Sequence, residues 1–142
     1  MALPAPERGL VVSYAYLWQN EHERGREEGL KDRPCVIILA VEDMGGVRMV
    51  SVAPVTHSVP ASLEEAVEIP LATKQRLGLD DARSWVMVSE VNQFSWPGPD
   101  VRPIRPGRFD YGFLPPNLFQ RVQDRMRAFA RTKRLRVVPR TE

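Results

Sequence analysis

The sequence predicts a mainly β protein that ends in one helix, an α+β order that suits a small barrel with a terminal helix. Short apolar runs separated by turn residues fill most of the first two thirds of the chain, and one segment near the C-terminus has clear helical spacing. No apolar stretch approaches the roughly 18 residues of a membrane span. The 142 residues fit one domain, with an N-terminal arm over residues 1–8, a C-terminal helix over 117–135 and a tail over 136–142.

The first strand is predicted over residues 10–17, where both faces carry apolar groups. Small and aliphatic side chains alternate there with Tyr14, Tyr16 and Trp18, a pattern typical of a strand in a barrel or a sandwich. Residues 19–29 then lose all periodicity and are charged and rich in polar groups. A loop of this length in a compact domain is usually either functional or disordered.

Two longer strands follow, and they should form a hairpin. The apolar runs 35–41 and 47–55 flank a turn in which Gly45-Gly46 supplies the positive φ of a tight reversal. Antiparallel pairing places the start of one run beside the end of the other. Arg33 and Thr56 should therefore lie about a residue or two apart across the ladder, at one end of the sheet.

The elements after this hairpin are shorter. In chain order the sequence predicts a turn-rich stretch (58–65), a strand (66–69), a helical turn (71–77), a strand (85–91) and an irregular segment (96–100). Gly78 can end the helical turn. The two prolines that flank Gly98 exclude regular structure from the irregular segment.

The last element is the clearest helix of the sequence. Asn117 can cap its N-terminus, and Gln120 three residues later completes a capping box. Six apolar residues follow helical spacing and should pack on the barrel: Leu118, Phe119, Val122, Met126, Phe129 and Ala130. Residues 136–139 belong to the tail, which is predicted to be extended or disordered.

The net charge of +2 is unevenly distributed. Residues 117–142 hold eight basic and two acidic residues, whereas residues 1–116 hold twelve basic and sixteen acidic ones. A basic C-terminal region can meet nucleic acid or an acidic protein. A solvated helix face is the commoner origin of such charges and explains most of them.

The N-terminus and the cysteine content bear on the compartment. The first residues have neither the basic nor the apolar region of a secretory signal, so the cytoplasm is expected. Cys35 is the only cysteine, which excludes an internal disulfide or a cysteine metal cluster. Its place inside an apolar run predicts a small core residue rather than a nucleophile.

Polar side chains at the open end of the hairpin predict a phosphate site. Arg33 lies at the mouth of one strand, and Thr56 and His57 lie at the exit of the next. The planar guanidinium of arginine matches the oxygens of a phosphate, and a neighbouring hydroxyl can donate a further hydrogen bond.

These residues resemble the PemK/MazF toxins of bacterial toxin–antitoxin systems. In that family an Arg-Pro step begins the second strand of an SH3-like barrel and a Pro-x-Thr step ends the third, as Arg33-Pro34 and Pro54-Val55-Thr56 do in this order. The family loop before the arginine often carries a glutamate five residues upstream, here Glu28, and residues 91–96 resemble a later strand segment that ends in an apolar–x–Trp step. The likeness runs from about Gly9 to the C-terminal helix. It implies an SH3-like barrel of the PemK/MazF/CcdB toxin type.

The resemblance also implies an activity and partners. It implies a toxin-like endoribonuclease that cleaves single-stranded RNA without a metal or another cofactor and leaves a 2′,3′-cyclic phosphate. It further implies a homodimer that a cognate antitoxin protein holds inactive. We therefore expect single-stranded RNA, an antitoxin and a second copy of the chain as partners, and no membrane.

Cutting RNA without a metal needs a base for the ribose 2′-hydroxyl, donors or cations for the charge on phosphorus oxygens, and an acid for the leaving 5′-oxygen. Arg33 suits the second role, and the resemblance implies that it also donates to the leaving group. Thr56 can donate to the phosphate or orient the nucleophile. Glu28 resembles the loop carboxylate assigned as the base in some members. His57 and His22 add the side chain best suited to proton transfer near neutral pH, although His57 stands where relatives often carry Ser or Thr.

Other residues are candidates for RNA binding. Trp18 and Trp96 can stack on bases, and His22 and Arg102 complete the predicted set. The rigid segment after Trp96 would hold it and Arg102 in fixed positions. Two histidines without an adjacent carboxylate motif do not support a zinc site.

Each candidate has a structural alternative. Arg33 can begin a strand and pair with Asp32 or a loop acid, Thr56 can be a turn hydroxyl that bonds its own backbone, and tryptophan more often packs in a core or an interface. For the whole protein there are two alternatives. One is a non-catalytic barrel of the same fold that binds a protein or RNA, and the other is a toxin directed at DNA gyrase.

Overall fold

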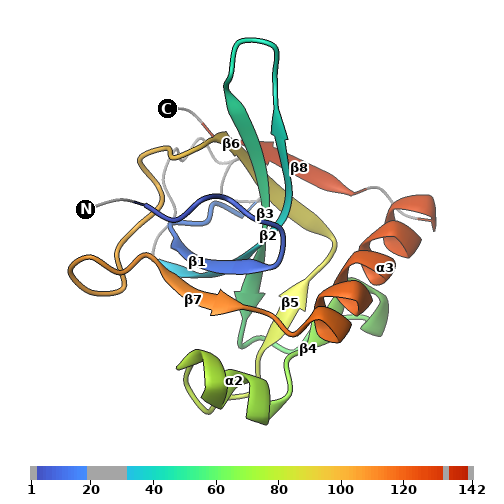
Figure 1. Cartoon of the computed structure of the whole chain (residues 1–142). Coiled ribbons are helices and arrows are strands. Elements are labelled where there is room, and N and C mark those ends of the chain that lie inside the picture. Colours follow the sequence, from blue (N-terminus) through green and yellow to red (C-terminus); the bar gives the residue numbers. More distant parts are fainter. Residues whose placement is uncertain (1–2, 19–31, 133–134, 141–142) are drawn as a thin grey trace.

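The computed structural model describes residues 3–18, 32–132 and 135–140, and it confirms a mainly β protein with a C-terminal helix (Figure 1). The described strands are β1 (Leu10–Tyr14), β2 (Arg33–Glu42), β3 (Arg48–Thr56), β4 (Ala66–Glu68), β5 (Trp85–Met87), β6 (Glu90–Ser95), β7 (Asp110–Phe113) and β8 (Arg136–Pro139). The helices are the single 3-10 turn η1 (Leu63–Glu65), α2 (Leu71–Leu77) and α3 (Pro116–Thr132).

The strands belong to one sheet in which β3 has a central place. The main order is β4-β5-β3-β2-β1-β7, and β6 and β8 extend the sheet from the other half of β3. The N-terminal half of β3 pairs with β6, whereas Val55 and Thr56 at its C-terminal end pair with β5. All of these pairings are antiparallel except that of β6 with β8, which is parallel.

The predicted hairpin is formed by β2 and β3, which project beyond the rest of the sheet in Figure 1. Its register runs from Cys35 opposite Pro54 to Glu42 opposite Arg48, with an irregularity between Ile37 and Leu39. The turn differs from the prediction in one detail. Gly46 alone adopts a positive φ, of 83°, while Gly45 does not.

Replacing Gly46 with alanine should therefore destabilise the protein by about 1–2 kcal/mol, because a Cβ disfavours the left-handed conformation. A Cβ at Gly46 would meet no atom within 4 Å, so the cost comes from the backbone alone. Gly45→Ala is the matched control and should be neutral or slightly stabilising. Urea unfolding of both variants measures the difference, and equal free energies of unfolding would contradict this account of the turn.

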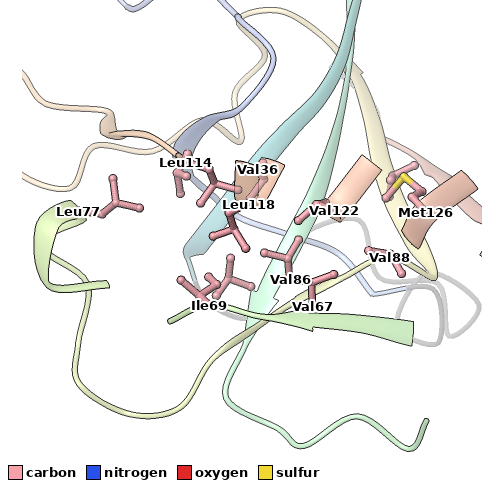
Figure 2. Close-up of a cluster of buried hydrophobic side chains, with 14 of the residues drawn as sticks. Val36, Val67, Ile69, Leu77, Val86, Val88, Leu114, Leu118, Val122 and Met126 are labelled. Carbon is pink, nitrogen blue, oxygen red and sulfur yellow. The ribbon is translucent and has the colours of Figure 1, made fainter. Parts of the chain in front are cut away.

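The core has two parts, one on each face of the sheet, because side chains alternate along the strands. Val11 of β1 belongs to the part that α3 covers, while Val12 and Tyr14 belong to the part on the opposite face. Figure 2 shows the first part, where Leu118 and Val122 of α3 meet the strands. Phe129 and Met126 complete the buried stripe of the helix, so the predicted packing of this helix is confirmed except at Ala130, which is exposed.

Several element bounds differ from the prediction. The helix begins at Pro116, so Asn117 lies inside it, and the Gln120 side chain donates to Asp124 instead of closing a capping box. Proline suits this first helical position because its missing N–H has no partner there in any case. The predicted strand 85–91 is divided into β5 and β6, and residues 136–139 form β8.

The first predicted strand also ends early, at Tyr14, and β7 has no counterpart in the sequence prediction. The prediction for α2 is confirmed: it ends at Leu77, and Gly78 follows in the left-handed conformation with a φ of 75°. None of the helices in the described ranges is long and apolar enough to cross a membrane.

Candidate functional site at the open end of the hairpin

The open end of the β2–β3 hairpin forms one wall of a hollow of about 680 Å³. The hairpin pairs Cys35 with Pro54, and the residues that continue this register are Arg33 and Thr56. Both line the hollow. The expected neighbourhood of a guanidinium and a hydroxyl on adjoining strands is therefore present, and it opens to solvent.

Arg33 is held at the edge of this hollow by one ring and one carbonyl. Its Cζ lies 5.1 Å from the centre of the Trp18 ring, a distance suited to a cation–π interaction. Its Nη1 donates a long hydrogen bond of 3.5 Å to the carbonyl of Val55. Its Nε has no hydrogen-bond partner among the described residues, so the protein groups described here leave the donor capacity of this guanidinium only partly used.

Thr56 is 8% exposed, and its Oγ1 accepts a hydrogen bond of 3.1 Å from the backbone N–H of Ser58. This is the turn interaction that the structural alternative predicted. An oxygen that accepts in this way still carries its own O–H, which remains able to donate. The bend after Thr56 has a second effect, because it places His57 on the same hollow. If the strand had continued, its alternation would have placed His57 on the opposite face from Thr56.

His57 contacts a carboxylate that the sequence did not connect with it. Its Nε2 lies 2.9 Å from Oδ2 and 3.2 Å from Oδ1 of Asp80, which follows α2 in the chain. Asp80 Oδ1 in turn accepts a hydrogen bond of 2.7 Å from the Lys74 ammonium. All three side chains line the hollow.

Lys74 is the buried end of this chain of contacts, with 2% of its side chain exposed. Its Nζ also donates to the Ser84 hydroxyl at 2.6 Å and to the carbonyl of Ala82. The hydrogen bond from Lys74 lowers the pKa of the Asp80 carboxyl below its ordinary value, and the neighbouring His57 acts in the same direction. Asp80 therefore stays ionised at neutral pH.

Acid should weaken the contribution of Asp80 to stability. Its pKa is lower in the folded than in the unfolded state, so its stabilising effect is complete above the unfolded value of about 3.9 and is lost as the pH falls below it. Asp80→Asn should therefore lower the free energy of unfolding at pH 7, and its difference from the wild type should shrink progressively as the pH falls below about 3.9. Urea unfolding at several pH values measures this, and an unchanged difference at pH 3 would contradict the assignment.

Tyr111 of β7 adds a further hydroxyl to the hollow. Burial raises the pKa of Tyr111, so its hydroxyl remains protonated and able to donate at neutral pH. Cys35 follows Arg33 by two residues but is fully buried, and burial raises the pKa of its thiol. The prediction that Cys35 is a core residue is confirmed.

The remaining predicted site residues fall in three places. Trp18 lines the hollow, where it also packs against the Tyr16 ring. Glu28 and His22 lie outside the described residues. Trp96 packs beside Phe94 on the other part of the core, and Arg102 lies 3.9 Å from Asp100. Neither Trp96 nor Arg102 is among the residues that line the hollow.

No pattern in the sequence connects Lys74, Asp80 and Tyr111 with Arg33. Lysine is rarely buried without a partner, so knowing that Lys74 is buried would have indicated a polar partner. A helix of seven residues is too short for its sequence to show which face is buried. Among the described residues no group of three or more His, Cys, Asp or Glu side chains is arranged to hold a metal ion.

Comparison with protein-family models and with curated proteins gave no match to this chain. The resemblance to the PemK/MazF toxins therefore remains a prediction from the motifs and their order.

Proposed function

We propose that this protein is a toxin-like, metal-independent endoribonuclease that cleaves single-stranded RNA in the hollow at the open end of the β2–β3 hairpin. The observation that carries the proposal is that Arg33, Thr56 and the His57–Asp80 pair line one open hollow. They supply a phosphate-binding cation, a neutral donor and a group able to transfer protons. These are the components that RNA cleavage without a metal requires.

Each group has a role in this proposal. Arg33 binds the non-bridging phosphate oxygens and stabilises the negative charge that grows on them. The Thr56 hydroxyl donates to the same phosphate. Trp18, whose ring centre lies 5.1 Å from the Arg33 Cζ, offers its ring to a neighbouring base.

The proposed barrel type and partners come from the family resemblance. The mainly β sheet with a terminal helix is compatible with an SH3-like barrel of the PemK/MazF type. We extend the proposal to a cytoplasmic homodimer that a cognate antitoxin neutralises, without a cofactor.

A cleavage assay in EDTA tests the proposal. A long single-stranded RNA, which offers many short sequences, should be cut by the wild type to fragments that end in a 2′,3′-cyclic phosphate. Thr56→Val should reduce the rate by about 10- to 100-fold, because it removes one donor to the charged phosphate while it keeps the shape of the side chain. Thr56→Ser keeps the donor and should retain most of the activity. Cleavage by Thr56→Val at the wild-type rate, or none by the wild type, would contradict the proposal.

A second candidate is a non-catalytic barrel that binds RNA or a protein. The turn hydrogen bond of Thr56 and its 8% exposure favour it, because they give this hydroxyl a structural role. RNA that binds to the wild type without being cut would support this candidate. Growth arrest on expression with intact RNA would instead favour a protein target such as DNA gyrase.

A further inference from the structure

A chain of polar contacts runs from Lys74 through Asp80 to His57, and all three side chains line the hollow. Its inner end is a lysine with 2% of its side chain exposed, and its outer end is an imidazole with 54% exposed. A buried ammonium is costly unless its donors are satisfied. The cost is offset here by three acceptors, namely Asp80, Ser84 and the carbonyl of Ala82.

These three acceptors match the three N–H groups of an ammonium, so Lys74 has no donor left for a ligand. Its effect on the hollow is therefore indirect. It fixes Oδ1 of Asp80, and the backbone N–H of Ala82 donates to the same oxygen at 3.2 Å. An aspartate that is half exposed is ordinarily mobile, but this one is held by two donors from its own loop and from α2.

The state of Asp80 decides the state of the His57 ring. An ionised carboxylate only accepts hydrogen bonds, so the contact of 2.9 Å requires a proton on His57 Nε2. In the neutral ring the other nitrogen, Nδ1, then carries the lone pair. Nδ1 lies on the ring edge away from Asp80 and belongs to a side chain that lines the hollow.

We propose that His57 is the general base of RNA cleavage through Nδ1, with Asp80 and Lys74 as positioning residues that fix the ring and its tautomer. This inference rests on the proposed function and adds to it a base, a specific nitrogen and two residues that no sequence motif indicated. It competes directly with Glu28, the carboxylate that the resemblance implies as the base.

Cleavage in this proposal is an attack of the ribose 2′-oxygen on the neighbouring phosphorus. Nδ1 takes the proton of the ribose 2′-hydroxyl, the 2′-oxygen forms a bond to phosphorus, and the bond from phosphorus to the 5′-oxygen breaks. The 5′-oxygen takes a proton from solvent water, and the imidazolium then returns its proton to the hydroxide so formed. The products are a 2′,3′-cyclic phosphate and a 5′-hydroxyl, and no oxidant, metal or other reactant is consumed.

Kinetics of RNA cleavage in EDTA test the inference at fixed pH. His57→Gln should lower kcat by about 10²- to 10⁴-fold with little change in KM, because it removes a base and not a binding contact. Asp80→Ala should lower kcat by about 10- to 100-fold, less than loss of the base itself. Asp81→Asn removes the neighbouring exposed carboxylate, which does not line the hollow, and should leave kcat unchanged.

A spectroscopic readout separates positioning from a merely structural role. The chain has only two histidines, so the ring nitrogens of His57 can be assigned by comparison with His57→Gln in ¹⁵N spectra. The neutral ring of the wild type should be protonated only on Nε2, and Asp80→Ala should give a mixture of tautomers. Lys74→Met should likewise increase the fraction of neutral His57 rings that carry the proton on Nδ1. If that variant does not fold, Asp80→Ala alone decides, because Asp80 is half exposed.

The outcomes are distinct. If the wild type cleaves, Arg33→Ala does not, and His57→Gln cleaves normally, this inference fails while the proposed function stands. Loss of activity in Glu28→Gln together with full activity in His57→Gln would assign the base to Glu28. If the wild type cuts no RNA, the proposed function fails and the base assignment fails with it.

Discussion

Replacing Arg33 with alanine should lower the rate of RNA cleavage by about 10²- to 10³-fold, the effect of removing a main donor to a charged transition state. Arg33 is the only guanidinium among the described residues that line the hollow. The loss should appear mainly in kcat, because the charge on the phosphate oxygens grows as the reaction proceeds. Cleavage of a labelled single-stranded RNA in EDTA measures it.

Two variants act as controls for this effect. Arg33→Lys keeps the charge but loses the planar fork, so it should recover only part of the activity. Arg48→Ala removes the same charge at the opposite, exposed end of β3 and should cleave at the wild-type rate. A preparation of Arg33→Ala that cleaves as fast as the wild type would indicate a contaminating nuclease or a different site.

The largest effect on stability is expected at the ion pair between Arg140, directly after β8, and Asp100 in the turn segment between β6 and β7. Arg140 Nη2 lies 3.0 Å from Asp100 Oδ2, and the two side chains are 2% and 8% exposed. Asp100→Ala should lower the free energy of unfolding by about 3–5 kcal/mol, because it removes the charge partner of a buried guanidinium. Urea unfolding measures this cost.

Arg102 also faces Asp100, but at 3.9 Å and with 38% of its side chain exposed, so Arg102→Ala should cost under about 1 kcal/mol. The double variant Asp100→Ala/Arg140→Met should be more stable than Asp100→Ala alone, since it removes the stranded charge together with its partner. If Asp100→Ala lowers the free energy of unfolding by less than about 1 kcal/mol, the Arg140–Asp100 ion pair is not a main source of stability.

The neighbourhood of Arg33 and Thr56 was predictable because it follows from local rules. Two apolar runs joined by a short glycine turn must pair antiparallel, and the register then fixes which residues meet at the open end. Alternation alone would place His57 on the opposite face from Thr56, but a bend after Thr56 ends the alternation and brings His57 to the same hollow.

The contact of Asp80 with His57 could not be predicted, because it joins distant parts of the chain. Asp80 lies 23 residues from His57 in the sequence, and the two meet only because α2 and the loop after it fold against the end of β3. Arg140 meets Asn92 across 48 residues in the same way. Such pairs leave no periodic signal in one sequence, and for the same reason residues 136–139 were assigned to a tail instead of β8.

The place where RNA binds on the protein can be located directly. A pool of single-stranded RNA with 2′-O-methyl ribose cannot be cleaved, so it can be titrated into ¹⁵N-labelled protein while NMR signals are followed. We expect the largest shifts at the Arg33 side chain and at the Thr56 and His57 amides, and we expect Arg33→Ala to abolish them. Shifts confined to the exposed arginines of α3, with no change at the open end of the hairpin, would contradict it.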